Sequence, residues 1–184
     1  MAGHTTNAKA SGPGGNIFIR TINSISSLCG VIAATMIVSA VAITCQMIFV
    51  RFVLNQSTIW QTEAVVYLMV AATLIGLPYV QRHRGHVNVD LIPLMLNQGL
   101  RRALAILVLV ASIAVISIMV FYGAEQWYEA FHKGWRSDTV WGVRLAIPYL
   151  ALPVGFGLFM LQLIADLMGV ISKQSLPFDL EENE

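Results

Sequence analysis

Charged residues are scarce in this chain of 184 residues. Asp, Glu, Lys and Arg make up 11% of the sequence and hydrophobic residues 57%, whereas a typical soluble domain has roughly 25% charged residues. The 11 Lys and Arg residues are scattered, and a net charge of +1 provides no basic patch for a phosphate backbone. The composition therefore indicates a membrane protein and excludes nucleic acid as a partner.

Histidine and cysteine are also few, and none is placed for cofactor or metal chemistry. The histidines all lie outside the apolar segments, so no imidazole pair is available to hold a haem inside a bundle: His4, His83, His86 and His132. Both cysteines, Cys29 and Cys45, fall in the first apolar segment and are predicted to be small apolar fillers. The loops contain no cysteine, which argues against a thiol oxidase. We therefore expect no cofactor, no metal and no enzymatic activity.

Four apolar segments are long enough to cross a bilayer. A helix needs about 20 apolar residues to do so, and lipid offers no partners to the backbone of an open sheet. The predicted spans are Ile25–Val50, Ala64–Val80, Ala103–Tyr122 and Leu145–Val170, and Asp166 is the only charged residue inside them. We therefore predict an all-α integral membrane protein whose membrane domain covers residues 17–172. A disordered cytoplasmic tail is expected over residues 1–16 and an acidic cytoplasmic tail over residues 173–184.

The positions of lysine and arginine predict the orientation. An even number of spans places both tails and the middle connection on one face, which carries Lys9, Arg20, Arg82, Arg84, Arg101, Arg102 and Lys173. The other face has only Arg51, Lys133, Arg136 and Arg144. Because basic residues favour the cytoplasmic side, both termini are predicted to lie in the cytoplasm of a bacterial cell, with the chain in the inner membrane. The clustered arginines Arg82, Arg84, Arg101 and Arg102 are expected to face anionic lipid headgroups.

All four tryptophans fall on the predicted periplasmic side: Trp60, Trp127, Trp135 and Trp141. Indole rings are favoured at headgroup depth, so an aromatic belt is the first interpretation. A docking surface for another protein is the alternative.

The first periplasmic connection ends in Thr58-Ile59-Trp60-Gln61, which has the spacing of a capping box for the second helix. Glu63 follows within the first turns, where the helix dipole favours a carboxylate. Arg51 is close enough in sequence to form an ion pair with Glu63 that would staple the first two helices. Two separately solvated charges are the alternative.

Other local features concern the later part of the chain. A short amphipathic helix is predicted in the cytoplasmic interface after Asp90, although this stretch is alternatively the frayed start of the third span.

The third helix is expected to continue out of the membrane and stop at Gly134. Pro153, near Gly155 and Gly157, is expected to bend the fourth span and permit close approach of a neighbour, although glycines there can equally be neutral. Asp166 is expected to reach headgroups or a cytoplasmic arginine.

The spans lack the features of a self-sufficient transporter, because they contain no charged groups near the midplane and no evident repeat. An interior of Val, Ile, Leu, Ala and Met offers no means to bind a hydrophilic solute. The sequence therefore predicts a structural subunit of a larger assembly. The competing hypotheses are an independent four-helix membrane redox protein and a small channel.

Several short motifs occur in a characteristic order: Arg51-Phe52-Val53-Leu54-Asn55, Trp60-Gln61-Thr62-Glu63, Gly76, Gly85-His86-Val87-Asn88-Val89-Asp90 and Ile147-Pro148. Over about residues 25–170 the chain thereby resembles the small, DctQ-like membrane subunit of tripartite ATP-independent periplasmic (TRAP) transporters.

The resemblance implies partners and a role. In that family a large membrane subunit binds substrate and sodium and moves by an elevator mechanism, and a soluble periplasmic binding protein delivers an organic acid. The small subunit extends the static scaffold in the lipid bilayer. By match to the family pattern, the positions expected to be structural or to lie at a subunit interface are Arg51, Trp60, Glu63, His86 and Asp90. None of them is expected to bind substrate.

Overall fold

The computed structural model of the chain describes residues 17–83 and 98–172. Its helices are α1 (Ile17–Phe52), α2 (Ile59–Arg82), α4 (Gln98–His132), α5 (Ala146–Tyr149) and α6 (Ala151–Ile171). Four candidate spans, with α5 and α6 counted as one, are long and apolar enough to cross a membrane, which confirms the predicted number. The two predicted tails and the predicted interfacial helix after Asp90 lie outside the described residues.

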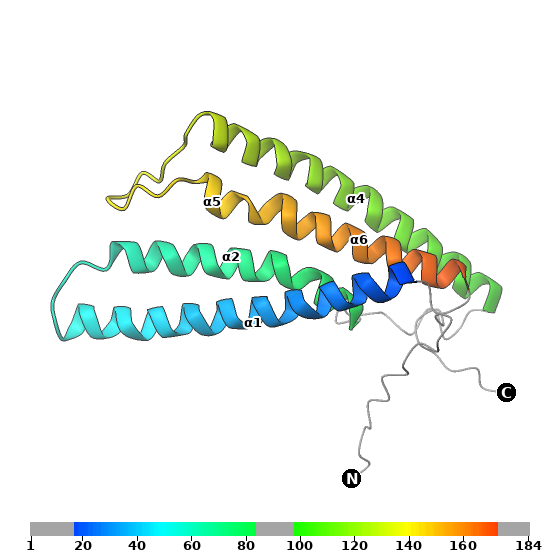
Figure 1. Cartoon of the computed structure of the whole chain (residues 1–184), viewed down its shortest axis with the longest axis horizontal. Helices are drawn as coiled ribbons and strands as arrows, with labels where there is room; N and C mark the ends of the chain where they lie inside the picture. Colours follow the sequence, from blue (N-terminus) through cyan, green and yellow to red (C-terminus); the bar gives the residue numbers. More distant parts are fainter. Residues whose placement is uncertain (1–16, 84–97, 173–184) are drawn as a thin grey trace, which may run out of the picture.

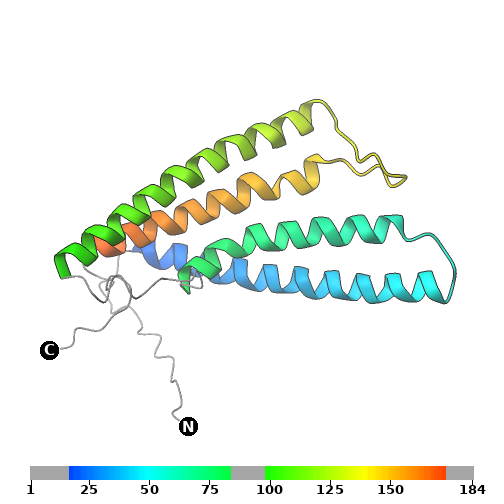
Figure 2. The same ribbon diagram turned by 180° about the vertical axis from the view of Figure 1, so that it is seen from behind.

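The long helices lie side by side in a row with the order α1, α2, α6, α4 (Figure 1 and Figure 2). We call the end of the row that holds Ile17 and Ser172 the tail end. The opposite end, which holds the connections 53–58 and 133–145, is called the loop end. Near the tail end α1 also contacts α6, and toward the loop end the α1–α2 pair diverges from the α4–α6 pair. The arrangement is an open row and not a closed bundle.

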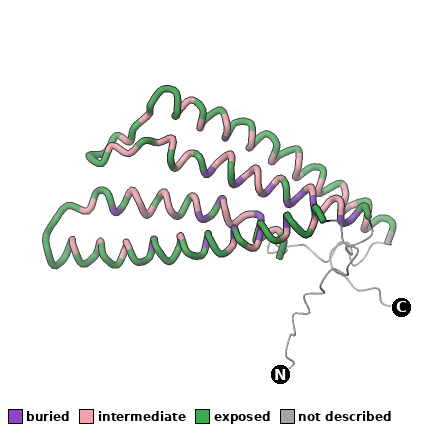
Figure 3. Tube along the Cα trace, viewed as in Figure 1, coloured by how far each residue is buried: buried purple, intermediate pink, exposed green. Residues whose placement is uncertain are grey.

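Burial is greatest on α6, which contacts all three of the other long helices (Figure 3). The outer helix α4 is the least buried of the four spans. Large apolar side chains on the two outer helices are therefore exposed, among them Val38, Phe49, Leu107 and Phe121. Such surfaces suit lipid or another apolar protein surface, because the hydrocarbon core is as apolar as these side chains.

A glycine allows the two central helices to approach each other closely. A Cβ built on Gly155 would lie 2.7 Å from the Cβ of Leu74 and 2.8 Å from the Leu74 carbonyl carbon and oxygen. No atom lies within 4 Å of a Cβ built on Gly157. The predicted close approach is confirmed at Gly155, and the neutral alternative holds at Gly157.

The fourth span is interrupted near its start. Pro153 has no N–H, so it cannot donate to the carbonyl of Tyr149 four residues earlier, and the helix divides into α5 and α6 at Leu150. Leu150 itself keeps helical dihedral angles, with φ −57° and ψ −28°. The structure thus shows a local interruption of the fourth span at Leu150, and the predicted bend stays a prediction.

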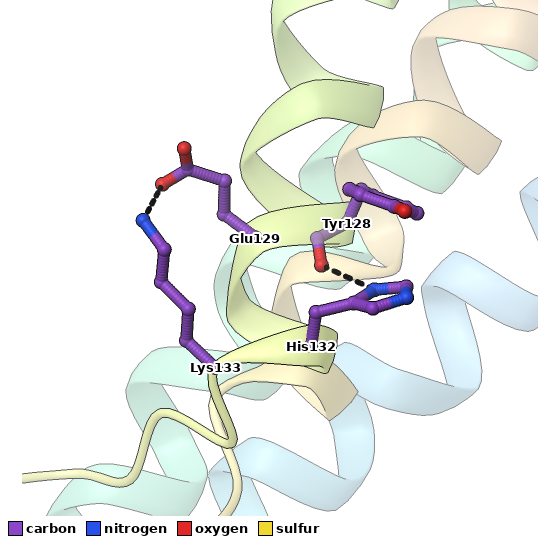
Figure 4. Close-up of polar contacts among 4 residues, drawn as sticks. All are labelled: Tyr128, Glu129, His132 and Lys133. Atoms are coloured by element: carbon purple, nitrogen blue, oxygen red, sulfur yellow. Dashed lines mark hydrogen bonds and ion pairs between the residues drawn. The ribbon is translucent and has the colours of Figure 1, made fainter.

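The helix α4 continues beyond its predicted apolar span to His132, as expected. Contacts between residues four apart hold its last turns (Figure 4): Lys133 Nζ lies 3.1 Å from Glu129 Oε2, and His132 Nδ1 donates to the Tyr128 carbonyl at 3.2 Å. Gly134 then has φ +62°, a left-handed conformation that ends helices.

Candidate functional site

The connection 133–145 forms an irregular hairpin, which we call the 135–145 hairpin. The Ser137 amide donates to the Val143 carbonyl at 2.9 Å, and the Leu145 amide donates to the Trp135 carbonyl at 2.9 Å. Gly142 provides the turn with φ +58°, which an L side chain rarely adopts. These backbone bonds give a surface connection a defined shape beside the start of α2.

Glu63 binds this hairpin to α2. Its Oε2 accepts a hydrogen bond from Thr139 Oγ1 at 2.6 Å, and its Oε1 accepts from Tyr67 Oη at 2.9 Å and from the Ser137 hydroxyl. Hydrogen bonds to an ionised carboxylate are stronger than hydrogen bonds between neutral groups. Beside them the rings of Trp60 and Trp141 pack with their centroids 6.4 Å apart. We call Glu63, Ser137 and Thr139 the Glu63 clamp.

The Glu63 clamp contradicts the predicted ion pair between Arg51 and Glu63. Among the described residues no ion pair joins Arg51 to Glu63. The carboxylate faces the 135–145 hairpin, whereas Arg51 is exposed at the end of α1. The contact therefore connects α2 to a segment more than 70 residues away, and the staple between the first two helices is wrong.

The predicted capping box is also wrong. Helix α2 does begin after Thr58, but the Thr58 side chain makes no capping hydrogen bond. Gln61, its expected partner, is 2% exposed, and its Oε1 has no partner among the described residues. The side chain of Gln61 is turned into the protein and not back toward the helix start.

A second polar cluster lies inside the row toward the tail end. Ser26 Oγ donates to Gln162 Oε1 at 2.5 Å, and Gln162 Nε2 donates to Asp166 Oδ1 at 2.9 Å and to Asn23 Oδ1 at 3.2 Å. Gln81 Nε2 donates to the other Asp166 oxygen at 3.0 Å. We call these five residues the tail-end network, which joins α1, α2 and α6.

The tail-end network gives Asp166 hydrogen bonds from Gln162 on its own helix and from Gln81 on α2, and the expected contact of Asp166 with headgroups or a cytoplasmic arginine stays a prediction. It also qualifies the view of the spans as purely apolar. Ser26 and Gln162 are each 1% exposed. A signal was present in the sequence, because Asn23 and Ser26 are three residues apart and Gln162 and Asp166 are four apart, so each pair shares a helix face.

Two of the predicted lipid-facing arginines make contacts within the chain. Arg82 donates to the Asn23 carbonyl at 2.6 Å and to the Ser27 hydroxyl. Arg102 donates to the last carbonyls of α6, at 3.0 Å for Val170 and 2.6 Å for Ile171, where a cation also meets the negative end of the helix dipole. The side chains of Arg84 and Arg101 lie outside the described residues, so the lipid contact remains a prediction.

The other predicted positions are dispersed. At the loop end Trp127 stacks on Phe131 with ring centroids 5.6 Å apart, and Lys133 Nζ lies 5.6 Å from the Trp135 ring centroid. His86 and Asp90 lie outside the described residues. The structure thus brings Trp60 and Glu63 together with the 135–145 hairpin and leaves Arg51 apart.

The hydrogen bonds of the Glu63 clamp and of the tail-end network hold separate segments of the chain together. No group of three His, Cys, Asp or Glu residues in the described ranges is placed to hold a metal ion. A groove of about 410 Å³ between α2 and the α5–α6 segment is lined by apolar and aromatic residues such as Leu68, Trp141 and Ile147. In the tail-end network, polar side chains of α1, α2 and α6 form hydrogen bonds with one another.

Comparison with known proteins gives consistent matches. Residues 40–173 match the family described as "Tripartite ATP-independent periplasmic transporters, DctQ component". The chain is 28% identical over 132 residues to the ectoine TRAP transporter small permease protein TeaB of Halomonas elongata, covering 72% of this chain and 68% of that protein. It is 26% identical over 133 residues to the C4-dicarboxylate TRAP transporter small permease protein DctQ of Vibrio cholerae, covering 60% of this chain and 57% of that protein.

The resemblance seen in the sequence motifs is thereby confirmed. The matched region includes the last part of α1, from residue 40, and all of α2, α4, α5 and α6. This multi-pass membrane chain with four candidate spans belongs to the DctQ family, the small permease subunits of TRAP transporters, and it is a transporter subunit and not an enzyme.

Proposed function

We propose that this chain is the static scaffold of a sodium-coupled importer of an organic acid. In this proposal a large membrane subunit binds the solute and moves, and a periplasmic binding protein delivers it. The family name supports a tripartite assembly. The two relatives are named for ectoine and for C4-dicarboxylates, which supports a small organic acid or zwitterion as the solute class.

The positions of the polar groups support this proposal. The tail-end network joins polar side chains of α1, α2 and α6 inside the row, and the Glu63 clamp joins α2 to the 135–145 hairpin at the loop end. The outer faces of α1 and α4 present large exposed apolar side chains. A row of helices fastened in this way is suited to packing along a partner and keeping its shape.

We also propose that both termini are cytoplasmic, so that the tail end faces the cytoplasm and the loop end the periplasm. The excess of Lys and Arg on the tails and middle connection supports this orientation. The four tryptophans then lie at the periplasmic interface. The interfacial helix after Asp90 would rest on the cytoplasmic surface.

The proposal is tested by reconstitution. The purified chain alone in liposomes is expected to move no radiolabelled ectoine or C4-dicarboxylate, and the chain with its large subunit and binding protein is expected to take up its solute in a sodium gradient. The small and large subunits should copurify in a one-to-one complex. Solute flux through the isolated chain would contradict the scaffold role.

Glu63 provides a test of the clamp. In Glu63→Gln the amide keeps one acceptor oxygen and loses the negative charge, so Ser137 and Thr139 are held less firmly. We expect faster hydrogen–deuterium exchange across residues 135–145 and slower uptake by the complete transporter at equal expression. The affinity of the binding protein for its solute, measured alone, should not change.

The matched control is Glu125→Gln, because Glu125 is exposed on α4 and has no hydrogen-bond or ion-pair partner in the described part of the chain. It removes the same charge near the same end of the row. Equal exchange of the 135–145 segment in wild type and Glu63→Gln would contradict the clamp.

A further inference from the structure

A hollow at the loop end lies between the end of α4, the 135–145 hairpin and α5. Its volume is about 660 Å³, which is within the usual range of ligand sites. Its walls combine aromatic and aliphatic side chains with two arginines, the main residues being Trp127, Phe131, Trp135, Arg136, Arg144 and Leu150. It is separate from the Glu63 clamp and from the tail-end network.

The two arginines face each other across the hairpin. Arg136 and Arg144 form an antiparallel bridge, the arrangement in which like charges on directly opposite residues are destabilising. In the part of the chain that the structure describes, neither guanidinium has a hydrogen-bond or ion-pair partner. Glu129, an acidic residue near the end of α4, is bound to Lys133. The hollow therefore carries two arginines without an ion-pair partner among the described residues.

The remaining walls require a ligand that is partly apolar. Trp127 and Phe131 stack on one side, and Ile147 and Leu150 at the start of the fourth span lie on the other. The hollow thus sits where a membrane-spanning helix begins, which is the depth of lipid headgroups. A small soluble anion would use the arginines and leave the apolar walls in contact with water.

We propose that this hollow binds a phospholipid, with the phosphate held by Arg136 and Arg144 and the glycerol and upper acyl chain against the aromatic and aliphatic walls. Two guanidinium groups can share the oxygens of one phosphate, and this removes the repulsion between them. The indole rings of Trp127 and Trp135 are suited to the same interfacial depth. The lipid would hold the 135–145 hairpin against the ends of α4 and α5.

The test uses the complex of the chain with its large subunit in phosphatidylcholine nanodiscs containing a small fraction of phosphatidylglycerol, with retained lipid counted by native mass spectrometry. In Arg136→Gln/Arg144→Gln, retention of phosphatidylglycerol is expected to fall by on the order of tenfold. Arg51→Gln is the matched control, because Arg51 is an exposed arginine at the same end that does not line the hollow, and it should retain lipid as wild type does.

A second variant tests the apolar part. Ala146 lines the hollow, so Ala146→Phe should fill it while leaving both arginines in place, and lipid retention should again fall. The unfolding temperature of each variant reports whether it is folded. Equal retention in wild type and the double arginine variant would overturn the proposal.

Two further outcomes would assign the hollow to a ligand other than a phospholipid. Displacement of the lipid by glycerol 3-phosphate at equal concentration would show a bare phosphate site. Loss of the large subunit or of the binding protein from the double arginine variant, with lipid retention unchanged, would show that the arginines contact a protein. Either result would overturn the phospholipid assignment.

Discussion

Replacing Gly155 by alanine is expected to destabilise the helix row by about 1–3 kcal/mol, because the added methyl group cannot fit against α2. The atoms that it would meet include the backbone carbonyl of Leu74, so the two central helices would have to move apart and not merely adjust a side chain. The free energy of unfolding of the chain in detergent micelles, measured by denaturant titration, should fall. The yield of complex with the large subunit should fall with it.

Gly157→Ala is the matched control on the same helix, two residues away. A Cβ at this position meets no atom within 4 Å, so only the intrinsic helix preference of alanine over glycine acts, which is about 1 kcal/mol in favour of alanine. Its stability should be unchanged or higher. If Gly155→Ala were as stable as Gly157→Ala, the close approach of α2 and α6 would be wrong.

Replacing Gln162 by leucine is expected to lower the free energy of unfolding by about 1–3 kcal/mol, because the buried Ser26 hydroxyl loses its acceptor and two further hydrogen bonds are lost. The volume of the side chain is nearly kept, so the loss would come from hydrogen bonds. Ser26 would lose its acceptor, and Asn23 and Asp166 would each lose a donor. Individual hydrogen bonds between membrane helices contribute about 0.6 kcal/mol on average, so the expected loss depends on three bonds failing together. The free energy of unfolding in detergent measures the effect.

Gln46→Leu is the control for this change. Gln46 lies on α1 and is exposed, so the same substitution removes no contact within the row. Its stability should match wild type. A Gln162→Leu variant with wild-type stability would show that the tail-end network does not hold α1, α2 and α6 together.

Much of the fold could be predicted from the sequence because hydrocarbon imposes strict rules. Length and apolar composition alone identified four helices, and Gly134 marked the end of the helix that continues past its span. The helix ends were less predictable, since α1 and α4 extend well beyond their apolar segments. The order of the helices in the row could not be predicted, because apolar side chains of similar size do not specify which neighbour they contact.

The polar contacts were predicted less well, for a physical reason. The Arg51–Glu63 pair and the capping box were both inferred from nearness in sequence. The structure instead connects Glu63 to Ser137 and Thr139, which are far away along the chain. Gln162 was missed because a single amide in an apolar run resembles an isolated tolerated residue. Only its spacing from Asp166 and the matching pair on α1 indicate a shared network.

The scaffold role is tested most directly by measuring whether the row changes shape during transport. Cys29 and Cys45 are first replaced by alanine, and new cysteines at Ser57 and Gln126 are spin-labelled. Pulsed electron paramagnetic resonance of the reconstituted transporter then reports the distance between the α1–α2 pair and the α4–α6 pair at the loop end. The account predicts the same distance distribution with and without sodium and solute. A shift of the distribution by several ångströms between these states would contradict it.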